Sequence, residues 1–177
     1  MKRLFVALAV IGMLTSCSDS GTGDRKPTVR GFADPAGQYT VAFHGTPEAT
    51  VNTAPMPDGS SLELTTYSAS VGSTLESSLC VDFSEQAANG GTLSLEGARD
   101  GALENTGMVL LESESIRLQG REGIAFRGSG PRGQAWSRIF VDGDSLCTVM
   151  FISGLGTDLS SEGTEFLDSF SFTEATA

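Results

Sequence analysis

Residue types that commonly build active sites are scarce in this sequence. Histidine occurs once, at His44, and three cysteines are spread widely along the chain. A zinc site of histidine and cysteine therefore has no local set of ligands. The sequence also contains no G-x-S-x-G segment, so a triad that uses His44 as its base has no recognisable nucleophile. We predict no catalytic residue, no metal and no cofactor, and we expect His44 to be a solvent-facing residue where a strand ends.

Positive charge is scarce as well. The chain has 11 basic and 22 acidic residues, which gives a formal net charge of −11 at pH 7. So negative a surface repels phosphate backbones, and this argues against nucleic acid as a partner. Cationic peptides, basic protein faces and divalent metal ions stay open as ligands. Simple solubility also explains the charge without any ligand.

Long apolar runs are missing too. The one marked apolar stretch, Leu4 to Leu14, follows the basic residues Lys2 and Arg3. A helix needs about 20 apolar residues to cross a bilayer, so this stretch is typical of a secretory signal peptide. The segment Leu14-Thr15-Ser16-Cys17 resembles a bacterial lipobox. That resemblance implies cleavage before Cys17, acylation of its thiol and a membrane anchor outside the cytoplasm.

The chain is therefore expected to have four parts: a signal peptide (1–16), a lipidated cysteine with a flexible tether (17–31), one globular domain (32–173) and a short tail (174–177). The tether is predicted because residues 18–30 show no apolar periodicity. Ser18 replaces the aspartate that is familiar as an inner-membrane retention signal. In a cell with two membranes this favours the periplasmic face of the outer membrane, and otherwise we expect the outer face of the plasma membrane.

Alternating apolar and polar residues predict most of the domain to be β-strand. The predicted strands are 37–44, 49–54, 61–69, 79–85, 108–118, 123–127, 134–141 and 146–153. Apolar residues at intervals of three and four predict one helix over 93–105, capped by Thr92, and a second over 158–170. Strand runs separated by single helices indicate an α+β domain, with an antiparallel sheet of about 6–8 strands and two main helices packed on it.

Three motifs in the domain look functional at first sight. Gly128 to Gly133 matches G-x-G-x-x-G, but that motif binds phosphate only where a helix follows, and here a strand is predicted to follow. We interpret it as a hairpin loop. Asp142-Gly143-Asp144 lacks the remaining ligands of a calcium loop and predicts a hairpin turn. Glu112 and Glu114 alternate with serines, as expected at a strand edge that faces water.

Two cysteines, Cys80 and Cys147, remain once Cys17 is lipidated. An even number of thiols in an oxidising compartment favours a disulfide between them. The alternative is two buried free thiols, because cysteine packs as a small apolar residue. A separation of their Cα atoms beyond about 7 Å would exclude the bond.

Part of the domain resembles a known family. The segment YTVAFHGTPE, Tyr39 to Glu48, is similar to the F-x-V-x-F-P-G-x-P opening of PsbP-like α/β/α sandwich proteins. The segments 98–103, 120–123 and 166–170 are similar to exported bacterial members of that group. The resemblance covers residues 32–172 and implies the sandwich fold and a tendency to act by binding. It implies no reaction.

We therefore expect a membrane-anchored, non-catalytic domain that binds a protein or an envelope ligand. Such a domain would expose an apolar patch of a few hundred Å², here around Trp136 or Phe151. An envelope assembly or structural factor is the first alternative and would show no discrete pocket. A hydrolytic enzyme with an unrecognised site is the second, and would hold titratable groups in contact within a concave pocket.

Overall fold

The computed structural model describes residues 29–56, 59–88, 91–131, 133–154 and 159–174. The elements in this part follow in the order β1 (Arg30–Ala33), β2 (Tyr39–Phe43), β3 (Glu48–Pro55), β4 (Ser61–Val71), β5 (Thr74–Asp82), α1 (Ser84–Ala88), α2 (Leu95–Thr106), β6 (Val109–Leu118), β7 (Arg121–Gly130), β8 (Gly133–Asp142), β9 (Ser145–Ser153), α3 (Ser161–Asp168) and β10 (Ser171–Phe172).

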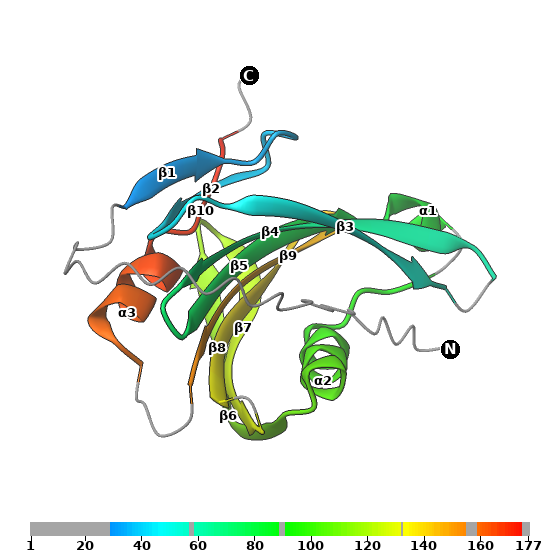
Figure 1. Cartoon of the computed structure of the whole chain (residues 1–177). Coiled ribbons are helices and arrows are strands. Elements are labelled where there is room, and N and C mark those ends of the chain that lie inside the picture. Colours follow the sequence, from blue (N-terminus) through cyan, green and yellow to red (C-terminus); the bar gives the residue numbers. More distant parts are fainter. Residues whose placement is uncertain (1–28, 57–58, 89–90, 132, 155–158, 175–177) are drawn as a thin grey trace.

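The strands form one large and one small sheet (Figure 1). The large sheet has seven strands in the order β3-β4-β5-β9-β8-β7-β6, and each neighbouring pair is antiparallel. The small sheet has the order β1-β2-β10. The predicted α+β class with a single antiparallel-sheet domain is confirmed.

Both faces of the large sheet are covered near its centre, where β8 and β9 are buried along most of their length. On one face α2 lies against β7 and β8. On the other face α3 lies against β9 and β2, and the small sheet extends this cover (Figure 1). The second face is rich in aromatic side chains, and we call the cluster there the aromatic core. Its most deeply buried aromatic members are Tyr39, Phe43, Phe140, Phe151, Phe166 and Phe170.

Local sequence explains the helix ends. Ser94 accepts a hydrogen bond from the backbone N–H of Gly97 at 3.1 Å and caps α2, so this helix begins after Ser94 and not after the expected Thr92. Gly107 ends α2 in the left-handed conformation, at φ +66°. Ser160 caps α3 in the same way, and α3 is shorter than the predicted span 158–170.

All eight predicted strands are present, and both hairpin interpretations are confirmed. Gly130 pairs with Gly133 across the β7–β8 turn, so the G-x-G-x-x-G segment lies in a hairpin with no helix after it. Asp142 pairs with Ser145 across the β8–β9 turn, where Gly143 has φ +61°.

Three short elements were not predicted. β1 begins at Arg30, within the segment interpreted as tether, and β10 has only two residues. α1 begins at Ser84, where a strand was predicted to continue to residue 85. The predicted signal peptide, Cys17 and the predicted tether up to residue 28 lie outside the described residues. No helix in the described ranges is both long and apolar enough to cross a membrane.

A disulfide joins β5 to β9, near the end of β5 and the start of β9. Cys80 and Cys147 face each other in the antiparallel register, their Cα atoms lie 4.0 Å apart, and their sulfurs are bonded. Cys147 is buried in the aromatic core, and Cys80 packs against it from a half-buried position. The bond therefore crosslinks two neighbouring strands in the middle of the large sheet.

Replacing both cysteines by alanine should lower the free energy of unfolding. The bond closes a loop with a sequence separation of 67 residues, which corresponds to about 4 kcal/mol in the chain-entropy model. Urea unfolding of the oxidised protein and of the Cys80→Ala/Cys147→Ala variant measures the difference. Mass spectrometry of non-reduced peptides should find Cys80 linked to Cys147, and two free thiols in the exported protein would contradict this prediction.

Candidate functional site

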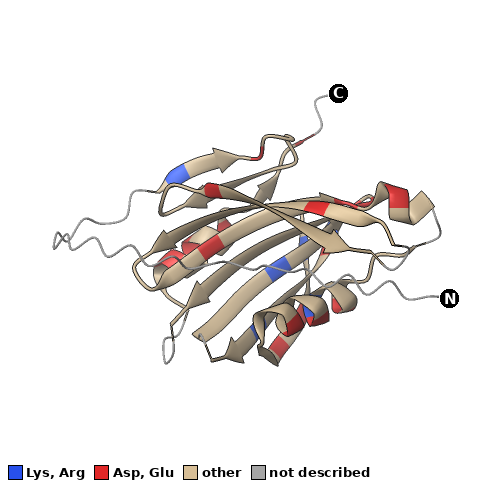
Figure 2. Cartoon of the chain, turned by 45° about the vertical axis from the view of Figure 1, so that its right-hand side comes forward, with Lys and Arg blue, Asp and Glu red and all other residues tan. Residues whose placement is uncertain are grey.

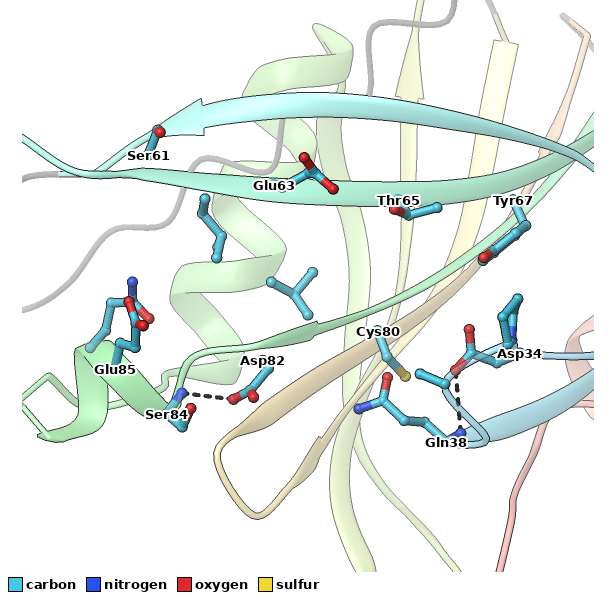
Figure 3. A pocket seen from close by; sticks show the side chains of 15 residues that line it. Asp34, Gln38, Ser61, Glu63, Thr65, Tyr67, Cys80, Asp82, Ser84 and Glu85 are labelled. Carbon is cyan, nitrogen blue, oxygen red and sulfur yellow. Dashed lines mark hydrogen bonds between the residues drawn. The ribbon is translucent and has the colours of Figure 1, made fainter.

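A pocket of about 530 Å³ lies on the face of the large sheet that also carries the small sheet. β4 and β5 form its floor, the turn after β1 closes one end, and the start of α1 closes the other (Figure 3). Its volume falls in the range of about 300–1,000 Å³ that is usual for small-ligand sites.

The pocket begins where the cover of the small sheet ends. Tyr67 on β4 lies under this cover, with its ring 4.6 Å from the ring of Phe32 between centroids. Farther along the same face of β4 the side chains are Thr65, Glu63 and Ser61, and all three line the pocket (Figure 3). The pattern of side chains therefore changes from aromatic to polar at the point where the sheet face becomes open.

The charged groups of the pocket wall all have one sign. Four carboxyl side chains line it, Asp34, Glu63, Asp82 and Glu85, and none of its lining residues is lysine or arginine. Figure 2 shows the wider context, in which acidic positions greatly outnumber basic ones on strands and helices alike. The pocket is therefore a region of negative potential.

Most arginines in the described ranges are paired elsewhere. Five of them form ion pairs outside the pocket: Arg99 with Asp100, Arg117 with Glu122, Arg121 with Asp142, Arg127 with Glu112 and Arg138 with Asp168. Within the described ranges no lysine or arginine lies at ion-pair distance from Asp34, Glu63 or Asp82. Burial, and then the negative charge of Asp34, raises the pKa of Tyr67, which is consistent with an uncompensated carboxylate beside its phenol.

Backbone hydrogen bonds hold two of these carboxylates in place. Asp34 accepts from the backbone N–H of Gln38 at 3.3 Å, across the turn before β2. Asp82 accepts from the backbone N–H of Ser84 at 2.8 Å and so fixes the start of α1 (Figure 3). In the part of the chain that is described, no three histidine, cysteine or acidic side chains are grouped so that they could hold a metal ion.

A second polar cluster surrounds His44, which was expected to face solvent. This expectation is wrong, because His44 is only 6% exposed. Its Nδ1 lies 2.6 Å from Oε1 of Glu76, and its backbone N–H donates to Oε2 of the same carboxylate at 2.8 Å. Its Nε2 lies 3.6 Å from a carboxylate oxygen of Glu165 on α3. Glu76 is itself only 1% exposed.

The geometry around His44 joins two elements of structure. Among the residues described, the hydrogen bonds of the His44 ring and of its backbone N–H both go to Glu76. The pair connects β2 of the small sheet to β5 of the large sheet. Both hydrogen bonds satisfy polar groups that would otherwise be buried without partners.

Removing the buried carboxylate should therefore destabilise the fold. We expect Glu76→Ala to lower the free energy of unfolding by about 3–5 kcal/mol, as is typical when one partner of a buried polar pair is removed. Glu165→Ala is the matched control and should change it by less than about 1 kcal/mol, because the Glu165 side chain is 70% exposed. Equal effects of the two variants in urea unfolding would contradict this assignment.

Two aromatic and two acidic residues that the sequence singled out lie outside the residues that line the pocket. Trp136 and Phe151 were expected near an exposed patch, and this is wrong because they are 9% and 1% exposed. Their rings pack together with centroids 6.3 Å apart. Glu112 and Glu114 are exposed on the edge strand β6, as predicted. The large apolar side chains that are exposed on strands lie instead on the edge strands β3 and β6, namely Val51, Val109, Leu110 and Leu111.

The sheet order, the two covers and the pocket define an α/β/α sandwich of the PsbP-like class. A solved structure with this fold is the solution structure of cyanobacterial PsbP (CyanoP) from Synechocystis sp. PCC 6803. It aligns with a TM-score of 0.56 at 12% sequence identity, over 91% of this chain and 99% of that chain. No protein-family model matches the sequence, and a search of the curated proteins finds no match. The likeness therefore shows the fold alone.

Proposed function

We propose that this chain is a lipid-anchored domain outside the cytoplasm, which acts by binding a ligand in the acidic pocket and not by catalysis. The observation that carries the proposal is the pocket itself, whose wall combines four carboxylates with no basic side chain. A nucleophile beside a base would favour catalysis, and among the described residues that line the pocket there is no histidine to act as such a base. The PsbP-like fold, which is associated with binding in the resemblance described above, supports the same reading.

A photo-reactive amino acid placed in the pocket tests this proposal in the native envelope. Position 61 suits the experiment because Ser61 is exposed and lines the pocket. Position 115 is the matched control, since Ser115 is also exposed but lies on β6 at the edge of the sheet. We expect a ligand or partner to be crosslinked from position 61 and not from position 115.

A different result would favour an assembly factor. β6 is a free edge of the large sheet, and it exposes Val109, Leu110 and Leu111 at 67%, 41% and 48%. Free edges with apolar side chains can pair with a strand of another protein. Crosslinks from position 115 and none from position 61 would overturn the pocket proposal in favour of this edge.

The anchor can be tested separately. We expect Cys17→Ala to move the protein from the membrane fraction to the soluble fraction of the envelope, because acyl chains on this residue supply the attachment. Mass spectrometry of the wild-type protein should find an N-terminal acylated cysteine at position 17. A mature N-terminus at another residue without fatty acid would contradict the prediction. Ser115→Ala is a useful control, as it leaves both the lipobox and the disulfide unchanged and alters only an exposed side chain.

A further inference from the structure

One lining residue of the pocket carries an unused hydrogen-bond acceptor. Gln86 on α1 is only 9% exposed, and its Oε1 has no hydrogen-bond partner in the described part of the chain. A buried acceptor without a partner is costly, so such groups are commonly found where a ligand supplies the donor. Oε1 of an amide accepts hydrogen bonds, so a partner that satisfies it by hydrogen bonding brings an N–H or O–H group.

The carboxylates that line the same pocket as Gln86 indicate the charge and the length of this partner. They come from different elements: Asp34 from the turn before β2, Glu63 from β4 and Asp82 from the end of β5. In Figure 3 Asp34 lies at one end of the pocket and Asp82 at the other, with Glu63 on the wall of β4. They are too dispersed to form a described metal-binding group. A ligand that meets them all is extended and has separate positive groups.

The remaining wall suits a chain of methylene groups between these charges. Apolar contacts are available from Pro35 and Ala36, in the turn that closes one end of the pocket. Lysine-like and arginine-like groups pack their apolar stems on such surfaces while their charged ends stay near carboxylates. The ring of Tyr67 offers a face for a cation at the end that Asp34 also lines.

We infer that the acidic pocket binds an extended organic cation that carries separate ammonium or guanidinium groups, one of which donates a hydrogen bond to Oε1 of Gln86. This inference rests on the proposed function, since it names the ligand class of the same pocket. A free polyamine and a basic peptide segment share this chemistry. A single divalent metal ion does not, because the carboxylates among the described residues are too dispersed to ligate one compact ion.

The first experiment compares these sources directly. Spermidine, a terminally blocked Lys-Gly-Lys-Gly-Lys peptide and magnesium chloride are titrated into the mature protein at matched ionic strength, and binding is followed by calorimetry and by backbone amide shifts. We expect an organic cation to shift amides of residues 61–67 and 82–88, and magnesium to leave them unchanged. If the peptide binds more tightly than spermidine, the source is a protein segment, and the reverse order indicates a free polyamine. Shifts with magnesium alone, or with none of the three, would overturn the inference.

Charge variants locate the binding within the pocket. Glu63→Gln and Asp82→Asn should each weaken the organic cation about threefold, the effect of one partly screened ion pair. Asparagine keeps the cap of α1, so Asp82→Asn should fold normally. Glu114→Gln is the matched control, because it removes the same charge from an exposed position on β6. Equal weakening by all three variants would show attraction by net charge only and overturn the assignment.

Gln86→Met should raise the stability of the free protein and lower its affinity for the organic cation. Methionine keeps the length of the side chain and removes the unpartnered acceptor, so we expect a higher midpoint of thermal unfolding without ligand. The same variant should bind the organic cation about tenfold more weakly, because the hydrogen bond to a charged donor is lost. Unchanged affinity would exclude Gln86 as a ligand contact. If pocket crosslinking from position 61 succeeds while every cation fails to bind, the inference is wrong and the proposed function stands.

Discussion

The large sheet is apolar on both faces at its centre, and the rest of the structure depends on how those faces are covered. β9 is buried along nearly all of its length, so neither face of the central strands can meet water. One face is covered by α2. The other needs the small sheet and α3 together, and the aromatic core fills the space between them. The position of the small sheet, in which β10 from the end of the described chain pairs with β2 near its start, follows from this requirement.

The second cover is smaller than the sheet beneath it, and the pocket is the part of the sheet that stays open. The side chains of β4 follow this boundary, with Tyr67 under the cover and Glu63 beyond it. An open sheet face with apolar side chains would expose a patch prone to aggregation. Polar and acidic residues avoid this hazard, and they also create the negative wall that we propose as a ligand site. Protection against aggregation and the proposed binding therefore both favour polar and acidic side chains on this part of β4.

Local patterns predicted the strands and hairpins, because period-2 alternation and turn glycines are encoded within a few neighbouring residues. The pairing of β10 with β2 could not be predicted from the sequence, because two residues carry no periodicity and the partner strand lies far away in the chain. His44 and Glu76 were missed for a different reason. Charged residues are rarely buried, and only the register of the folded chain shows that each satisfies the other. The pocket likewise joins segments from β1 to α1, none of which has a binding motif of its own.

The position of the disulfide has a consequence for how a ligand would be received. Cys80 lines the pocket floor, and its bond to Cys147 holds that floor to the central strand β9. The strands β5 and β9 cannot separate at this point while the bond is intact. A ligand would therefore bind to a pocket floor that already has its final shape, and little conformational entropy of the protein would be lost on binding. Cleavage of this one covalent bond would remove that advantage without altering any carboxylate that meets the charges of the ligand.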